Sequence, residues 1–158
     1  MNDYLNGAAN QLTKRAKLLL HKIPRNLPRE FHLLEQRSRD RIHQVLDDLK
    51  KNIDNKTPAL RLRALRRAVR ELDHLETVGI AALNRADLHE EVWLNELIWR
   101  ITQEISYPLL PPVVTSLSHS YFQIYTDLIL LRMPLAEGSF LLHLPDLYHE
   151  LAHPVVTP

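Results

Sequence analysis

Cysteine is absent from this 158-residue chain, and its absence excludes disulfides, thiolate zinc sites and cysteine nucleophiles. A metal site in this chain would therefore use histidine, aspartate or glutamate side chains. The chain also has only three glycines, too few to favour a phosphate-binding glycine loop or a dinucleotide fingerprint, and it has no GxSxG elbow. Nucleotide-dependent and serine-hydrolase chemistry therefore rank low.

The sequence also lacks an excess of one charge and a long apolar run. The net charge is +1 with 25% charged residues, so no bulk field attracts nucleic acid or an anionic membrane. The apolar runs fall far short of the roughly 18 residues of a membrane span, and the N-terminus lacks the apolar core of a signal peptide. We therefore expect a globular, cytoplasmic protein that binds neither membranes nor nucleic acid.

Residues 1–106 have apolar side chains at helical spacing, which predicts a mainly α protein that begins with an antiparallel helical bundle. Thr57 and Pro58 are typical of an N-cap followed by proline, and Asp87 with Glu90 resembles a capping box. The predicted helices cover residues 2–22, 29–53, 57–84 and 87–105. The predicted core stripes of the last three helices are Phe31, Leu34, Ile42, Val45, Leu49 and Ile53; Leu62, Leu65, Val69, Leu72 and Leu75; and Leu94, Leu97, Ile98, Ile101 and Ile105.

The pattern changes near Ser106, so residues 107–158 are predicted to form a second region. Three prolines within residues 107–112 predict a linker or the wall of a groove. Residues 121–131 are rich in aromatic and β-branched side chains, which favours one strand or a hairpin, with a buried helix as the alternative. Residues 133–139 are predicted to form a loop, and a helix is predicted from Phe140 to His153.

This last predicted helix contains the motif HExxH, formed by His149, Glu150, Leu151, Ala152 and His153. Positions i and i+4 lie on one face of a helix, so both imidazoles can bind one zinc ion while the glutamate points toward a bound water. The motif therefore predicts zinc as the cofactor. His149 and His153 are the candidate metal ligands, and Glu150 is the candidate catalytic residue.

The order of strand, loop and HExxH helix resembles the zincin class of zinc metallopeptidases over roughly residues 121–153. The resemblance implies an edge strand beside the cleft that pairs with an extended peptide or protein substrate. It also implies that His149 and His153 hold the zinc and that Glu150 is the general base of a peptide-bond hydrolase. Residues 107–158 are accordingly predicted to be the start of a zincin-like domain.

A catalytic zinc needs a third protein ligand, which in this class follows the second histidine, whereas here only residues 154–158 remain. We therefore expect the N-terminal portion of a longer metallopeptidase, truncated within its catalytic domain and inactive as this fragment. His143 is the preferred internal third ligand, before Glu137 and Asp146. Pro154 is expected to disfavour helical geometry at His153. The alternative function is a helical protein–protein interaction module with a coincidental HExxH.

Arginines are concentrated in two of the predicted helices, and such a cluster could bind phosphates. Nucleic-acid binding is nevertheless the weaker reading, because nearby carboxylates predict ion pairs and no aromatic side chain is interleaved for base stacking. Trp93 and Trp99 are predicted to be core or interface residues. The arginines are Arg37, Arg39, Arg41, Arg61, Arg63, Arg66, Arg67 and Arg70, and the carboxylates are Asp40, Asp47, Asp48, Glu71, Asp73 and Glu76.

Overall fold

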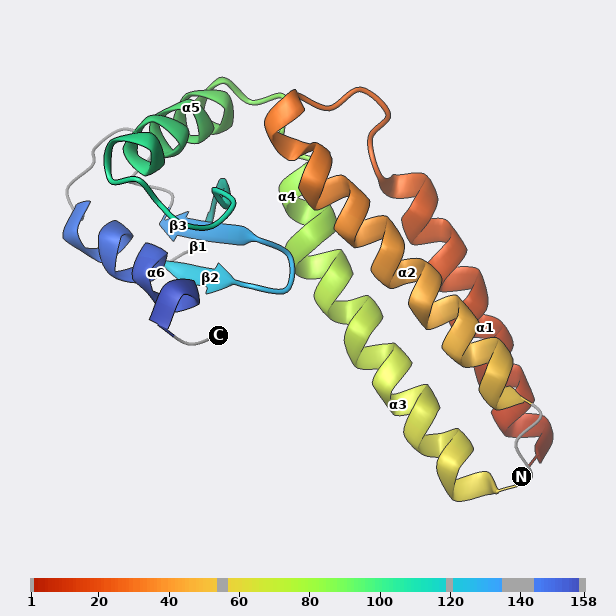
Figure 1. Cartoon of the computed structure of the whole chain (residues 1–158). Helices are drawn as coiled ribbons and strands as arrows, with labels where there is room; N and C mark the ends of the chain where they lie inside the picture. The colour runs from red at the N-terminus through yellow and green to blue at the C-terminus, as the bar shows by residue number, and fades with distance from the viewer. Residues whose placement is uncertain (1, 54–56, 119–120, 135–143, 157–158) are drawn as a thin grey trace. The chain divides into compact units, whose positions relative to one another are not determined.

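A computed structural model describes residues 2–53, 57–118, 121–134 and 144–156 of the chain (Figure 1). The protein is mainly helical, as the sequence predicted, and a small three-stranded sheet follows the first helices. It divides into two compact units. The helical unit comprises Met1–Arg25 and Glu35–Ala81, and the mixed unit comprises Asn26–Leu34 and Ala82–Pro158. This division does not coincide with the predicted boundary at residue 106, because the last helix before the sheet groups with the strands.

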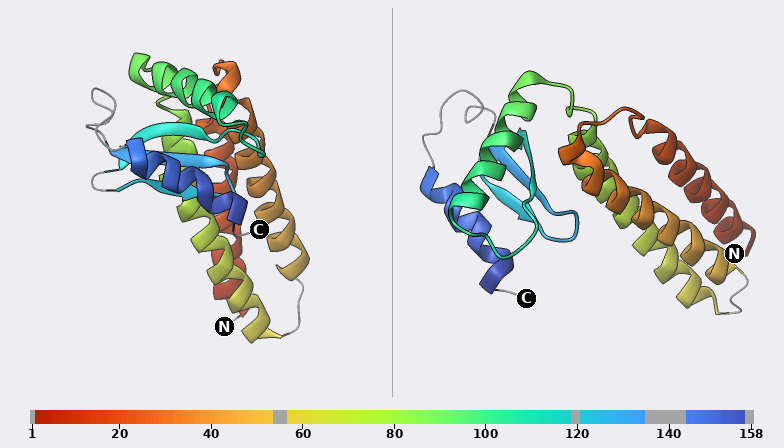
Figure 2. Two further views of the ribbon diagram at one scale, coloured as in Figure 1. Left: turned by 60° about the vertical axis from the view of Figure 1, so that its left-hand side comes forward. Right: turned by 45° about the horizontal axis from the view of Figure 1, so that its top comes forward.

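The helical unit contains three long helices, α1 (Asn2–Lys22), α2 (His32–Ile53) and α3 (Pro58–His74). Successive helices run antiparallel (Figures 1 and 2). The 3₁₀ turn η1 (Arg29–Phe31) precedes α2, and α3 continues into a π-helical turn, η2 (Leu75–Ile80), and the short helix α4 (Ala81–Leu83). The predicted helix positions are thus confirmed for this part of the chain. The core consists of aliphatic side chains from all three helices, including Leu5, Ala16, Leu19, Ile42, Val45, Leu49, Leu65 and Leu72.

The face of α3 that is buried differs from the predicted stripe. Leu65 and Leu72 are buried as expected, but Leu62 is 39% exposed and Val69 is 38% exposed. The buried face of α3 is formed by Leu65, Ala68 and Leu72. Leu62 and Val69 each lie one position outside this buried row. The prediction that Leu62 and Val69 are core residues was therefore wrong.

The mixed unit contains helix α5 (His89–Glu104), strands β1 (Val113–Ser118), β2 (Gln123–Tyr125) and β3 (Leu130–Pro134), and helix α6 (Leu144–Val156). The strand order is β1-β3-β2, so β1 and β2 are the two edges of the sheet. β1 is parallel to β3, and β2 is antiparallel to it. Both helices cover one face of the sheet, because their buried side chains share one core with strand residues: Leu94, Ile98 and Ile101 of α5, Leu147 and Leu151 of α6, and Val114, Leu131 and Met133.

The predicted hairpin is confirmed, since β2 and β3 are joined by a turn at residues 126–129, and the alternative of a buried helix was wrong. Strand β1 was not predicted. The predicted loop at residues 133–139 begins with two residues of β3, and its remainder lies outside the described residues. Within the described ranges, no helix combines the length and the apolarity needed to cross a membrane.

Three predictions about the helix ends were wrong. α5 begins after Leu88 with no side-chain cap, so Asp87 does not form a capping box, and Ile105 is exposed just beyond the C-terminus of this helix. α6 continues through Pro154 to Val156, so His153 is helical. Pro154 lies in the last turn of α6 and has no N–H, so the Glu150 carbonyl lacks its i+4 donor. The helix tolerates this loss because few helical hydrogen bonds follow Pro154. Pro145 lies in the first turn of α6, where a proline is compatible with a helix.

Candidate metal centre

The packing of α6 determines which of its side chains reach the surface. Leu147 and Leu151 are each 1% exposed and attach the helix to the core of the mixed unit, where α6 packs beside β2. Because a helix repeats every 3.6 residues, the motif histidines then lie on a different face from the two leucines. His149 and His153 are exposed, and Glu150 between them is half-buried.

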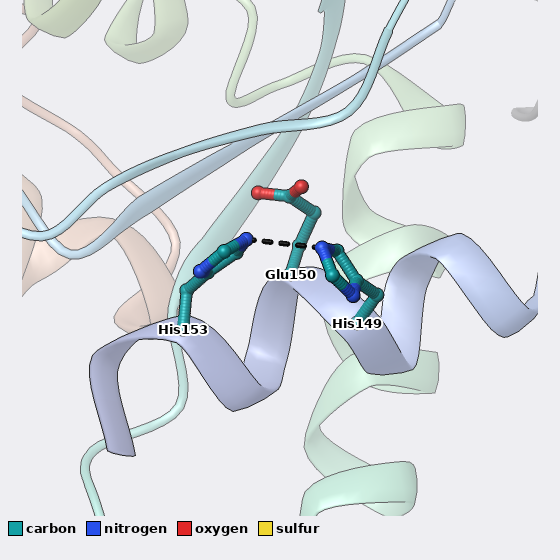
Figure 3. A group of neighbouring side chains, drawn as sticks. All are labelled: His149, Glu150 and His153. Atoms are coloured by element: carbon teal, nitrogen blue, oxygen red, sulfur yellow. Dashed lines mark hydrogen bonds between the residues drawn. The ribbon is translucent and has the colours of Figure 1, made fainter. Parts of the chain in front are cut away.

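The three predicted site residues lie close together (Figure 3). The Nε2 atoms of His149 and His153 are 3.1 Å apart, and their ring centroids are 4.6 Å apart at an interplanar angle of 85°. One donor atom from each histidine and one carboxylate oxygen of Glu150 all lie within 4.8 Å of one another. The side chains project from the same side of α6, so one small cation could meet all three.

The separation of the two imidazole nitrogens fits a shared zinc ion. Two nitrogens that each lie about 2.0–2.1 Å from one tetrahedral zinc are about 3.3 Å apart. The 3.1 Å between His149 Nε2 and His153 Nε2 is close to that value. Without a metal, the same contact is a hydrogen bond in which one Nε2–H donates to the other Nε2, so zinc binding requires both rings in the tautomer that carries the proton on Nδ1.

The position of the motif in the helix also favours a cation. His153 lies in the last turn of α6. The carbonyl groups of that turn give the C-terminus of a helix a partial negative charge, which stabilises a positive charge within the last turn. The field of the helix and the lone pairs of the two imidazoles therefore act in the same direction.

The described residues add no third ligand from the predicted candidates. Asp146 is an exposed residue of the first turn of α6 and is not part of the cluster. His143 and Glu137 lie outside the described residues. Across the described ranges, the one group of three or more metal-ligating side chains is His149, Glu150 and His153.

The two edges of the sheet differ, and sequence reasoning missed this difference. At β1, side chains of α5 bind the outward backbone groups: Asn95 bonds to Val114, and Glu91 accepts hydrogen bonds from the Ser116 amide at 3.1 Å and from the Ser116 hydroxyl at 2.7 Å. Arg85 forms an ion pair with Glu91 at 2.8 Å, so this fully buried carboxylate is neutralised. β2 is the edge strand beside α6.

Comparison of the chain with known proteins gives no match: no family model, no curated protein and no solved structure matches it.

Proposed function

We propose that α6 is the metal-binding helix of a zinc-dependent hydrolase of peptide bonds, of the zincin class that the sequence resembles. His149 and His153 hold the ion, and Glu150 is the general base. The observation that carries the proposal is the 3.1 Å between the two Nε2 atoms, with the Glu150 carboxylate within 4.8 Å. The helix brings the two imidazoles to one face, and their Nε2 atoms lie close to the spacing of two ligands of one zinc ion.

Bound at such a site, zinc lowers the pKa of a coordinated water to about 7 and polarises a carbonyl oxygen. The protein side chains perform the remaining steps. The carboxylate of Glu150 accepts the proton of the attacking water and then donates a proton to the leaving amine nitrogen. Its half-buried position beside the two histidines suits a proton carrier, because it lies within reach of the site without being enclosed in the core.

The substrate that the sheet favours is an extended peptide segment at the edge of β2. An extended peptide adds to a sheet by backbone hydrogen bonds with an edge strand. Side chains of α5 already bond the outward backbone groups of β1 at Val114 and Ser116, whereas β2 lies beside the motif helix. A peptide paired with β2 would therefore lie near the candidate site. The cytoplasmic location expected from the sequence stays part of this proposal.

The second candidate function is a helical interaction module with a coincidental HExxH. Exposed apolar side chains on the helical unit favour it, notably Tyr4 at 76% and Leu62 at 39% exposure. The two functions make different predictions for metal. A hydrolase of the proposed class retains zinc through His149 and His153, whereas an interaction module has no need of it.

The test is the zinc content of the full chain after reconstitution and desalting, compared with that of a His149→Ala/His153→Ala double variant. We expect about one zinc per chain in the wild type and none above background in the double variant. The same samples are then tested with internally quenched peptides, where cleavage that a chelator removes and zinc restores would overturn the prediction that the chain is inactive by itself. Equal zinc content in both proteins would exclude the site and with it the proposed hydrolase.

A further inference from the structure

No arginine of α3 pairs with a carboxylate among the described residues, contrary to the prediction of ion pairs. Arg39 pairs with Glu35 at 2.8 Å, and Arg41 pairs with Glu71. In contrast, Arg63, Arg66 and Arg70 have no carboxylate partner within the part of the chain that the structure describes. These three residues recur at intervals of three and four, so they lie on one side of α3.

The same three arginines border an open groove between α1 and α3. The groove has a volume of about 970 Å³, and its apolar lining includes Tyr4 and Leu12 of α1 and Leu62 and Val69 of α3. Leu62 and Val69 are the two residues of α3 that were predicted to be in the core and are instead exposed. This surface, which we call the α1/α3 groove, is therefore apolar at its centre and basic along α3.

Helix α5 also exposes apolar side chains, but its exposed charges are mainly acidic. Its exposed apolar side chains are Val92 at 43%, Trp93 at 41% and Trp99 at 56%, so neither tryptophan is in the core. The exposed charges on this helix are mainly acidic: Glu90, Glu96 and Glu104, against Arg100, which pairs with Glu96 at 2.6 Å. Tryptophan is the residue type most enriched in the energetic centres of protein interfaces. We call this surface the α5 face.

We propose that the α1/α3 groove binds the α5 face of a second copy of this chain. The two surfaces match in chemistry, because each combines exposed apolar side chains with charges, and the unpaired charges are basic on one and predominantly acidic on the other. Every copy carries both surfaces, and a closed dimer is the assembly in which two copies exchange them reciprocally. The alternative of phosphate binding explains the arginines but leaves the exposed Leu62, Val69 and Trp99 without a role. This inference is independent of zinc and of the proposed hydrolase.

The two tryptophans provide a direct readout, because both lie in α5 and the chain has no others. We expect the full chain to form a dimer in sedimentation velocity experiments, with tryptophan emission that moves to shorter wavelength as the protein concentration rises. The double variant Arg66→Glu/Arg70→Glu is expected to raise the dimer dissociation constant roughly tenfold or more. The charge-matched control Lys51→Glu/Arg67→Glu, outside the α1/α3 groove, is expected to dimerise like the wild type.

A charge-swap experiment tests the pairing of the two surfaces. The double variant Glu90→Arg/Glu96→Arg is also expected to dimerise weakly by itself. Mixed with Arg66→Glu/Arg70→Glu, it is expected to form a heterodimer close to the wild-type affinity, because in that pair both grooves face α5 charges of opposite sign. Circular dichroism of each variant checks that its helices are intact.

Three results would overturn the proposal. The first is a chain that stays monomeric at all concentrations, including one that binds duplex DNA through Arg66 and Arg70 with a steep dependence on salt. The second is a dimer that the groove variant does not weaken. The third is failure of the two charge-reversed variants to associate on mixing while each remains folded.

Discussion

The side-chain amide of Asn95 bonds to both backbone polar groups of Val114, since the Val114 N–H donates to Oδ1 at 2.8 Å and Nδ2 donates to the Val114 carbonyl at 2.8 Å. A neighbouring strand would satisfy an edge residue with the same pair of bonds. Together with Glu91 at Ser116, Asn95 therefore closes the β1 edge of the sheet from within the chain. The other edge of the sheet is β2, beside the HExxH helix, and it is the edge at which we propose that a peptide adds.

Replacement of Asn95 by leucine should destabilise the mixed unit. The substitution leaves the N–H and C=O of Val114 buried without these partners, and each such group costs about 1–3 kcal/mol, so we expect a loss of about 3 kcal/mol. Urea unfolding followed by tryptophan fluorescence measures it, because both tryptophans lie in α5. The matched control is Gln103→Ala, an exposed residue of the same helix, with an expected change within about 0.5 kcal/mol. Equal stabilities of the two variants would contradict the role of Asn95.

The helices could be predicted because their signals are local. Apolar spacing and the prolines around residues 24–28 placed α1 and α2, and Thr57 with Pro58 placed the start of α3. The buried face of α3 could not be read from spacing alone. Leu62 and Leu65 are equally apolar, and only the helices packed against α3 determine which of them is buried.

Strand β1 escaped prediction because its signal is not local. Thr115 and Ser116 interrupt its apolar pattern, and both are nonetheless buried. The amide and the hydroxyl of Ser116 bond to Glu91, which comes from α5 earlier in the chain. Two polar residues at i and i+4 on the apolar face of α5, beside Leu94 and Ile98, were the available sign that this helix binds a strand edge.

The candidate metal site was predictable because HExxH depends on the spacing of one helix. His149 and His153 meet through helical periodicity, which needs no distant contact. Ion pairing behaves differently, because a carboxylate near an arginine in sequence can point to another helix. Glu71 forms an ion pair with Arg41 of α2, and Glu76 forms ion pairs with Arg15 and Lys22 of α1.

Loss of either motif histidine should remove zinc binding. With His149→Ala or His153→Ala, one imidazole alone remains, and we expect zinc affinity to fall more than roughly 100-fold, since even changes to residues that only orient ligands cost about 10–100-fold. The measurement is zinc competition with a chromophoric chelator. His43→Ala is the control, because His43 is an exposed histidine of α2 outside the cluster, and we expect it to keep wild-type affinity. The site would be refuted by single variants that bind zinc as tightly as this control.

The stability of the helical unit should depend on pH through Glu76. Its carboxylate accepts hydrogen bonds from Lys22 and from Arg15, each at 2.7 Å, and these bonds to the charged form hold the pKa of Glu76 below its usual value. A carboxyl whose pKa is lower in the folded state stabilises that state above its unfolded pKa of about 4.3. The stabilisation is lost as the pH falls through the lower folded value.

The variant Glu76→Gln should therefore cost about 1 kcal/mol at pH 7, a value typical of partly exposed ion pairs. The difference from wild type should shrink as the pH falls below about 4.3. Urea unfolding followed by circular dichroism at several pH values measures both quantities. Asp40→Asn is the control, since Asp40 is exposed on α2 with no ion pair among the described residues, and its effect should stay small at every pH. A Glu76→Gln difference that stays constant down to strongly acid pH would show that its charge does not contribute.

Substitution of Glu150 by glutamine separates proton transfer from metal binding. Glutamine keeps the size and the half-buried position of Glu150 but cannot accept a proton, so any chelator-sensitive peptide cleavage measured with the wild type is expected to fall by a factor of about 10²–10⁴. Zinc affinity should stay close to wild type, because the two imidazoles hold the ion. Asp146→Asn, also a neutralised carboxylate of α6 but outside the cluster, should retain both zinc and cleavage. If Glu150→Gln instead loses zinc together with cleavage, Glu150 is a ligand, and the general base must be another residue.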